Sequence, residues 1–163
     1  MSPRQKPGRS KQDYETPADF VVAVGRRFGP ITYDLAASAG NAKALRFFDE
    51  AADSLAQNWT EALAEVGFGW LNPPFANLGA WAEKCALESR RMMPRALVTM
   101  LCPASVGTNW WEEHVDGCAA EVLFVRPRLA FVGCSDQYPK DLALVVYRGE
   151  IEGGTMYRPW KFK

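Results

Sequence analysis

Two consecutive prolines end a short apolar segment near the middle of this chain. Residues 68–71 (Phe-Gly-Trp-Leu) are followed directly by Asn72-Pro73-Pro74-Phe75. The apolar run is typical of a buried strand, and proline cannot continue the hydrogen-bonding ladder, so the strand must stop at this point. The side-chain amide of Asn72 is therefore expected at the carboxyl end of a strand, with an aromatic ring just beyond it.

This arrangement is suited to binding an exocyclic amine. The Asn72 side-chain oxygen and the Pro73 carbonyl can accept hydrogen bonds from an NH2 group, and Phe75 offers its face to the ring that carries the amine. Such an amine is a poor nucleophile because its lone pair is delocalised into the ring. Two acceptors favour a tetrahedral nitrogen whose lone pair is free to attack an electrophile. A plain turn after a strand is the alternative, because Asn-Pro and Pro-Pro are ordinary loop dipeptides.

Alternating helix and strand patterns predict an α/β fold with a largely parallel sheet. Thr16 and Pro17 predict the N-cap and first residue of a helix that ends at Gly29. Further helices are expected over 77–93 and 108–116, with a broken helical region over 41–65. Strands are expected over 31–35, 68–71, 96–102, 120–125, 128–132 and 142–148.

In such a sheet, ligands bind at the carboxyl ends of the strands. Asp34 ends the first predicted strand and Asn72 follows the second. We therefore expect these two polar side chains to line one site.

Composition limits the class of protein. The 163 residues, of which 48% are hydrophobic, are enough for one domain with a real core. No apolar run reaches the roughly 18 residues of a membrane span, and the N-terminus lacks the apolar core of a signal peptide, so a cytoplasmic protein is expected. The four cysteines form no C-x-x-C pair and His114 is the one histidine, which argues against a metal site and against a Ser-His-Asp triad.

The zero net charge conceals two basic ends. Residues 1–11 and 153–163 carry seven lysines and arginines and no acid, so the residues between them have an excess of acids. A basic N-terminal arm and a basic, aromatic C-terminal tail are suited to contact with a polyanion. The alternative for the arm is a solvated segment without a partner.

Several short segments follow one another in an order found in one enzyme family. They are Glu15-Thr16-Pro17, Tyr33–Ser38, Asn41–Lys43, Asp53–Leu55, Asn72–Phe75, Met100–Ala104, Thr108–Trp110 and Arg126–Phe131. From about Tyr14 to about Arg148 the chain resembles the compact Dam-type DNA N6-adenine methyltransferases of phages and prophages. The tetrapeptide matches the (D/N/S)-P-P-(Y/F/W) motif of amino-methyltransferases. Departures are Phe75 and Pro127, where the family usually has Tyr and Gly, and Lys140-Asp141-Leu142 in place of a Pro-Ser stretch.

The resemblance implies a Rossmann-like fold that binds S-adenosylmethionine (SAM) in a single compact domain. It implies a methyltransferase domain over 14–150, between an N-terminal arm (1–13) and a C-terminal tail (151–163). The catalytic residues would be Asn72, Pro73, Pro74 and Phe75. The cofactor would contact Thr16, Pro17, Asp34, Ala36 and Asp53.

One of these assignments, Asp34, also has a chemical basis of its own. The Asp34 carboxylate is suited to the ammonium of the methionine moiety. Asp53 is assigned to the adenosine end of the cofactor, with plain helix capping as the alternative.

The resemblance also implies the substrate, an adenine that swings out of duplex DNA and offers its N6 amine. Arg126, Arg128, Thr108 and Lys161 are the expected DNA contacts. The alternative for the two arginines is that they cap a strand end and pair with acids. No metal and no membrane are expected to take part. Two other functions stay open at this stage: methylation of RNA or of a protein glutamine amide, and a non-catalytic DNA-binding relic of the fold.

Overall fold

A computed structural model describes residues 14–65 and 67–163 of the chain. The predicted basic arm (1–13) lies outside the described residues. Within them, no helix combines the length and the apolar character that crossing a membrane requires.

The described residues form one seven-stranded sheet with the order β2-β1-β3-β4-β6-β5-β7. The strands are β1 (Tyr33–Asp34), β2 (Arg46–Phe47), β3 (Phe68–Leu71), β4 (Leu97–Pro103), β5 (Glu121–Arg126), β6 (Leu142–Arg148) and β7 (Met156–Lys161). Only β6 runs antiparallel to its two neighbours, β4 and β5, and the other paired strands of the described sheet are parallel. The carboxyl ends of all strands except β6 therefore lie at one edge of this sheet.

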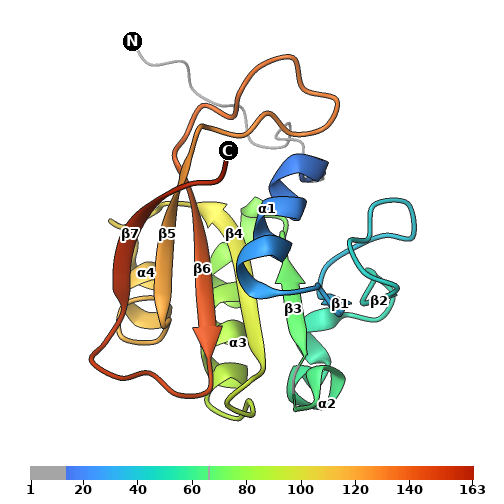
Figure 1. Cartoon of the computed structure of the whole chain (residues 1–163). Helices are drawn as coiled ribbons and strands as arrows, with labels where there is room; N and C mark the ends of the chain where they lie inside the picture. Colours follow the sequence, from blue (N-terminus) through green and yellow to red (C-terminus); the bar gives the residue numbers. More distant parts are fainter. Residues whose placement is uncertain (1–13, 66) are drawn as a thin grey trace.

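Helices cover both faces of the sheet (Figure 1). One face carries α1 (Ala18–Phe28), and the other carries α3 (Leu78–Ser89) and α4 (Asn109–His114). Two shorter pieces, η1 (Ser54–Ala56) and α2 (Trp59–Leu63), lie between β2 and β3 in sequence, and a one-turn η2 (Phe75–Asn77) precedes α3. The predicted α/β fold of the Rossmann-like type, with a largely parallel sheet in a compact domain, is confirmed.

The central strand β4 shows why this sheet is buried on both sides. All seven of its residues are buried. Leu97 and Leu101 pack into the core under α1, whereas Val98 and Met100 pack into the core under α3. This alternation follows from the two-residue period of a strand, and a strand that is buried at every position must have a layer on each face.

Several sequence-based element predictions are confirmed with small changes in their bounds. The strand over Phe68–Leu71 ends where the prolines require, and α1 ends before Gly29, which has a positive φ of 97° suited to glycine. The start of α1 was predicted one residue too early. Pro17 occupies the N-cap position, and the Thr16 hydroxyl accepts a hydrogen bond from Asn72.

Two predictions between strands were wrong. The region over 41–65, expected to be helical, contains the two-residue strand β2 and only short helical turns. The region over 128–132, expected to be a strand, is an irregular loop. Its backbone forms a hydrogen bond outside the sheet, in which the Val132 N–H donates to the Glu15 carbonyl at 3.0 Å.

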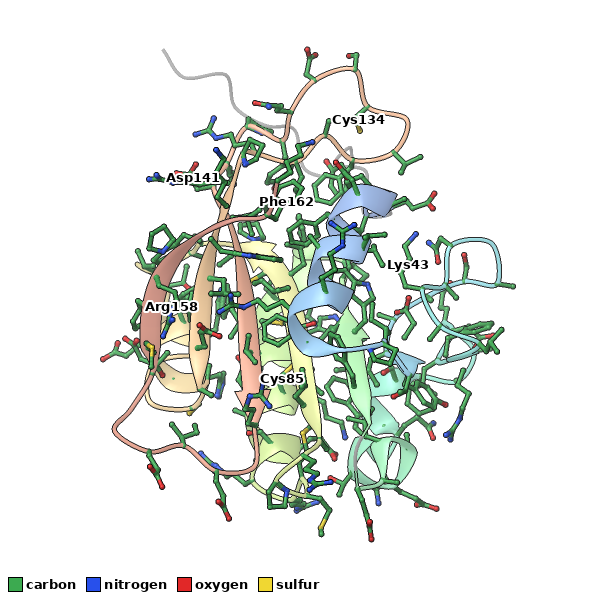
Figure 2. The ribbon with its side chains drawn as sticks, viewed as in Figure 1. Lys43, Cys85, Cys134, Asp141, Arg158 and Phe162 are labelled. Carbon is green, nitrogen blue, oxygen red and sulfur yellow. The ribbon has the colours of Figure 1, made fainter. Side chains whose placement is uncertain are left out.

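The C-terminal segment joins the sheet as β7, parallel to β5. Two of its aromatic side chains, Trp160 and Phe162, pack on α1, whereas Tyr157 stacks on Phe124 of β5 and stays exposed. The ring of Phe20 lies 5.5 Å from that of Trp160 and 4.9 Å from that of Phe162. The packing of Phe162 on α1 places the end of the chain over one face of the sheet (Figure 2).

The strand order reverses between β1 and β3. From β1 the chain passes outward to β2, then returns to the other side of β1 as β3. In open α/β sheets such a switch point leaves a crevice at the carboxyl ends of the two strands, because the connections leave in opposite directions. Asp34 closes β1 and Asn72 follows β3, so the fold brings both to this crevice.

Candidate active site

A cavity of about 950 Å³ opens at the switch point. It lies between the ends of β1 and β3, the segment 14–16 and the long connection from β1 to η1. Six of the residues predicted for catalysis or cofactor binding line it: Thr16, Asp34, Ala36, Asp53, Asn72 and Pro74. Its volume is at the upper end of the range for sites that take a cofactor-sized ligand.

The amide of Asn72 has its nitrogen bonded and its oxygen free. Nδ2 donates to the backbone carbonyl of Tyr14 at 2.5 Å and to Oγ1 of Thr16 at 3.0 Å. Oδ1 is buried and finds no hydrogen-bond partner among the described residues. A buried carbonyl oxygen without a donor is unfavourable, so this atom is a place where a donor on a ligand would be stabilising.

The carboxylate of Asp34 is almost wholly buried, with 2% of the residue exposed. Oδ1 accepts from the Ala36 N–H at 3.2 Å and Oδ2 accepts from the Lys43 N–H at 2.9 Å. Burial raises the pKa of Asp34 from 3.8 to about 6, and these two backbone donors oppose the rise only in part. The carboxylate therefore shapes the loop after β1 and also has capacity for a further positive partner, because two oxygens can accept more than two hydrogen bonds.

The other predicted cofactor contacts are arranged around the same cavity. Asp53 is at the N-cap of η1 in a left-handed conformation (φ 49°), and its side chain makes no capping hydrogen bond. Plain helix capping is therefore not its role. A non-glycine residue in this conformation is strained, which is common at ligand sites. Pro17 does not line the cavity: it directly follows Thr16 and is the N-cap residue of α1.

Phe75, the last residue of the motif, does not line the large cavity. It lines a smaller cavity of about 320 Å³, together with Trp110 and Tyr138. Its ring also belongs to an aromatic cluster in which the ring centroids of Tyr14 and Tyr138 each lie 5.7 Å away. Pro73 is buried and lines neither cavity, and Pro74 is exposed. The motif thus contributes to both cavities, with Asn72 and Pro74 at the large one and Phe75 at the small one.

Sequence reasoning missed several residues of the large cavity. Trp81 of α3 lines the cavity and stacks on Trp59 with 6.4 Å between ring centroids. Lys43 and Glu15 form an ion pair at 3.0 Å across two segments of its wall. Lys43, on the loop between β1 and β2, is labelled in Figure 2. The short distance in sequence between Trp81 and the proline motif could have indicated that Trp81 belongs to the site. Nothing in the sequence indicated that Lys43 and Glu15 form an ion pair.

The predicted DNA contacts lie at the same edge of the sheet as the cavity. Arg126 and Lys161 end β5 and β7 and are register partners, so they are neighbours. Arg126, Arg128, Thr108 and Lys161 are all exposed. Arg128 pairs with Asp141 at 2.9 Å, which is the alternative role foreseen for it. Asp141 and Phe162 lie toward the end of the molecule that carries the loop with Cys134 (Figure 2).

The described part of the chain contains no group of three or more His, Cys, Asp or Glu side chains placed to hold a metal ion. The thiols of Cys85 and Cys102 are fully buried, and burial raises the pKa of each. Cys85 and Cys102 are therefore core residues and not nucleophiles at neutral pH.

Comparisons with known proteins place the chain among methyltransferases. The model of the family described as DNA N-6-adenine-methyltransferase (Dam) matches residues 4–144. A DNA N-6-adenine-methyltransferase of Escherichia phage T1 is 26% identical over 137 residues, which cover 84% of this chain and 54% of the relative. A putative methyltransferase of Escherichia coli K12, YfdM, is 31% identical over 77 residues, which cover 44% of this chain and 85% of the relative.

The chain thus spans about half the length of the phage relative. The family match includes every residue predicted for catalysis and cofactor binding, together with Thr108, Arg126 and Arg128, and it ends within β6, before Lys161. Because the match covers most of the chain, this protein belongs to the DNA N-6-adenine-methyltransferase (Dam) family.

Proposed function

We propose that this protein transfers a methyl group from SAM to the N6 amine of an adenine that has been flipped out of duplex DNA. One observation carries the proposal: the Asn72 Oδ1 atom is buried, lacks a partner among the described residues, and belongs to a residue on the wall of a cofactor-sized cavity. An exocyclic amine is a donor that would satisfy this oxygen.

The cavity residues fit SAM. The buried Asp34 carboxylate matches the ammonium of a methionine moiety, because a cation would offset the desolvation that raises its pKa. Asp53 and Trp81 line the same cavity and are suited to the adenosine moiety, through the ribose hydroxyls and the face of the adenine ring. When bound, SAM supplies an electrophilic methyl group attached to a positively charged sulfur.

The motif residues act on the acceptor amine. Asn72 Oδ1 and the Pro73 carbonyl accept its two hydrogens, which draws the nitrogen toward a tetrahedral geometry with its lone pair available. After transfer the nitrogen is cationic and loses a proton to water through the Asn72 contact. No acidic general base is needed, and the acceleration comes from positioning and from preorganised acceptors.

The choice of adenine and of DNA rests mainly on the family, because the same acceptors would also fit the amine of cytosine or of a glutamine amide. The cluster of exposed basic residues at the cavity edge of the sheet, including Arg126 and Lys161, is consistent with a phosphate backbone nearby.

The direct test is incubation with methyl-labelled SAM and separate pools of duplex DNA, RNA and protein. We expect label in DNA, and mass spectrometry of the digested DNA should show N6-methyladenine without N4-methylcytosine. Transfer should weaken steeply as salt rises, because each neutralised phosphate releases counterions. Label confined to RNA or protein, or found on cytosine, would contradict the proposal, and SAM binding without any transfer would indicate a non-catalytic relic.

Phe75 is expected to act as the platform on which the flipped base stacks. Phe75→Tyr and Phe75→Trp should stay active, whereas Phe75→Leu should lose activity even though it fills much of the same volume. Base–aromatic stacking is worth about 1–3 kcal/mol, so the rate with DNA should fall by roughly 5- to 150-fold. Single-turnover methylation measures this.

A matched control separates stacking from packing. Phe131 is buried in the same aromatic cluster, with its ring centroid 6.3 Å from that of Phe75. Phe131→Leu should lower thermal stability at least as much as Phe75→Leu, because both remove a cluster ring, but it should retain more activity. Equal loss of activity in the two variants would show that Phe75 serves only in packing and does not stack on the base.

A further inference from the structure

We propose that Thr16 is a positioning residue for methyl transfer, and not the cofactor contact that the family resemblance implied for it. With the backbone carbonyl of Tyr14 it holds the Asn72 amide in the one orientation that turns Oδ1, and not Nδ2, toward the acceptor amine. The inference rests on the proposed function for its catalytic consequence, but the held amide is a property of the protein alone and can be tested without activity.

The orientation of the amide follows from donor and acceptor chemistry. The Tyr14 carbonyl can only accept a hydrogen bond, so the amide atom 2.5 Å from it must be the nitrogen. The Thr16 hydroxyl accepts the second hydrogen of the same nitrogen at 3.0 Å. Both donors of Asn72 are thereby used, and its buried Oδ1 is left as the atom that can take a ligand hydrogen.

The opposite orientation would prevent the reaction. A rotation of the amide by 180° would set NH2 against the NH2 of the substrate, so that donor faced donor. It would also set Oδ1 against the Tyr14 carbonyl, so that acceptor faced acceptor. The Tyr14 carbonyl therefore excludes this orientation, in which Asn72 could not activate the amine. The Thr16 hydroxyl stabilises the productive orientation because it accepts the second hydrogen of Nδ2.

The segment that supplies these two acceptors is itself fixed. Thr16 is buried, with 2% exposed. The Glu15 carbonyl accepts from the Val132 N–H at 3.0 Å, and the Glu15 carboxylate pairs with Lys43 at 3.0 Å. The Tyr14 ring packs on Phe131 at 5.0 Å between centroids. Contacts on both sides thus hold the acceptors in place before any substrate arrives, as preorganisation requires.

The test replaces Thr16 with valine, which keeps the shape and removes the hydroxyl, and with serine, which keeps the hydroxyl. Thr16→Val should lower kcat for DNA methylation by about tenfold, the value of one hydrogen bond, and Thr16→Ser should stay within about threefold of the wild type. The affinity of both variants for S-adenosylhomocysteine, measured by calorimetry, should be unchanged within about threefold.

The matched control is Thr99→Val. Thr99 is also a fully buried threonine, but it lies in the core on β4 and its hydroxyl has no partner among the described residues. This variant should keep the wild-type kcat. A Thr16→Val enzyme with wild-type kcat would overturn the inference. Affinity for S-adenosylhomocysteine falling as far as kcat would also overturn it, because Thr16 would then be a ligand contact.

A measurement on the free protein keeps the inference separate from the proposed function. In 15N NMR spectra the side-chain NH2 signals of Asn72, identified by their absence in Asn72→Asp, should exchange slowly with solvent in the wild type and in Thr16→Ser. One of the two should exchange faster in Thr16→Val. Equal exchange in all three would refute the held amide, whereas slow exchange in a wild type that transfers no methyl would refute only the proposed function.

The same geometry makes a prediction about the motif itself. Asn72→Asp gives Asp-Pro-Pro-Phe, which still conforms to the amino-methyltransferase pattern. A carboxylate cannot donate, so it would place an oxygen against the Tyr14 carbonyl and leave Thr16 without its donor. We expect kcat to fall by at least about tenfold. An aspartate variant with the wild-type kcat would show that the two bonds to Asn72 are dispensable.

Discussion

Replacing Asn72 with alanine is expected to lower the rate of methyl transfer by at least about 100-fold while the affinity for SAM stays nearly unchanged. The loss of one aligned acceptor in a water-excluded site is worth on the order of 3 kcal/mol of transition-state stabilisation. The acceptor is the Oδ1 atom that is buried without a partner in the described structure. The Nδ2 atom bonds only within the protein, to Tyr14 and Thr16. Single-turnover methylation and calorimetry with SAM would separate the two effects.

Asn72→Ala also removes the two bonds from Nδ2, so folding must be checked in the same preparation. Thermal unfolding should show a loss of about 1–3 kcal/mol, because buried partners are left unpaired, without a loss of the folded state at room temperature. If the variant methylates DNA at the wild-type rate, Asn72 does not activate the amine. If it loses SAM affinity as strongly as it loses rate, Asn72 is chiefly a cofactor residue.

The position of the site could be predicted from local sequence, because strong local signals fixed it. The prolines after Leu71 end β3 whatever the tertiary structure, and Asp34 ends β1 in the adjacent, parallel position, with Asp34 and Trp70 as register partners. Two short strands and the residues that end them were sufficient to place an amide and a carboxylate at one edge of the sheet.

Contacts between distant segments could not be predicted in this way. Phe75 was expected just beyond the strand, but its packing on Tyr14, Phe131 and Tyr138, which come from segments far away in sequence, had no local signal. The Thr16-Pro17 pair carried an N-cap signal, yet the hydroxyl serves Asn72, 56 residues away. Local capping rules give the residue types that need hydrogen-bond partners, but only tertiary structure decides which partners they find.

The strands that sequence analysis missed have weak intrinsic signals. Strand β2 is only two residues long, too short for any periodicity. Strand β7 contains Pro159, which removes a donor and is tolerated because β7 is the edge strand of the described sheet, paired only with β5. It is held there by the packing of Trp160 and Phe162 on Phe20, a long-range contact that propensity does not report.

The second large effect is expected at Asp34. A carboxylate–ammonium contact in a partly buried site is worth about 1.5–3 kcal/mol, so Asp34→Asn should weaken SAM binding by roughly tenfold or more. The side chain also bonds the backbone N–H groups of Ala36 and Lys43, and a disturbed loop could weaken binding in another way. Methylthioadenosine, which lacks the amino-acid moiety, separates these causes. Its affinity should be unchanged in Asp34→Asn if the carboxylate binds the ammonium, and should fall equally if the carboxylate only shapes the loop.

The pH dependence of binding gives an independent check on Asp34. In the free protein burial raises the pKa of Asp34 from 3.8 to about 6, so below about pH 6 the carboxyl is protonated and cannot attract a cation. The folded protein binds the proton more tightly than the unfolded chain, so the stability of the free protein should decrease as pH rises from about 4 to 6 and level off above.

The affinity for SAM should change with pH in the opposite sense to the stability of the free protein. It should rise up to about pH 6 and level off above it, because a bound ammonium favours the ionised carboxylate. Calorimetry near pH 6 in buffers of different ionisation enthalpy should therefore show protons released on binding in the wild type and none from this group in Asp34→Asn. An affinity independent of pH between 5 and 8 would mean that the Asp34 carboxylate does not meet the cation, and that another group holds the methionine moiety.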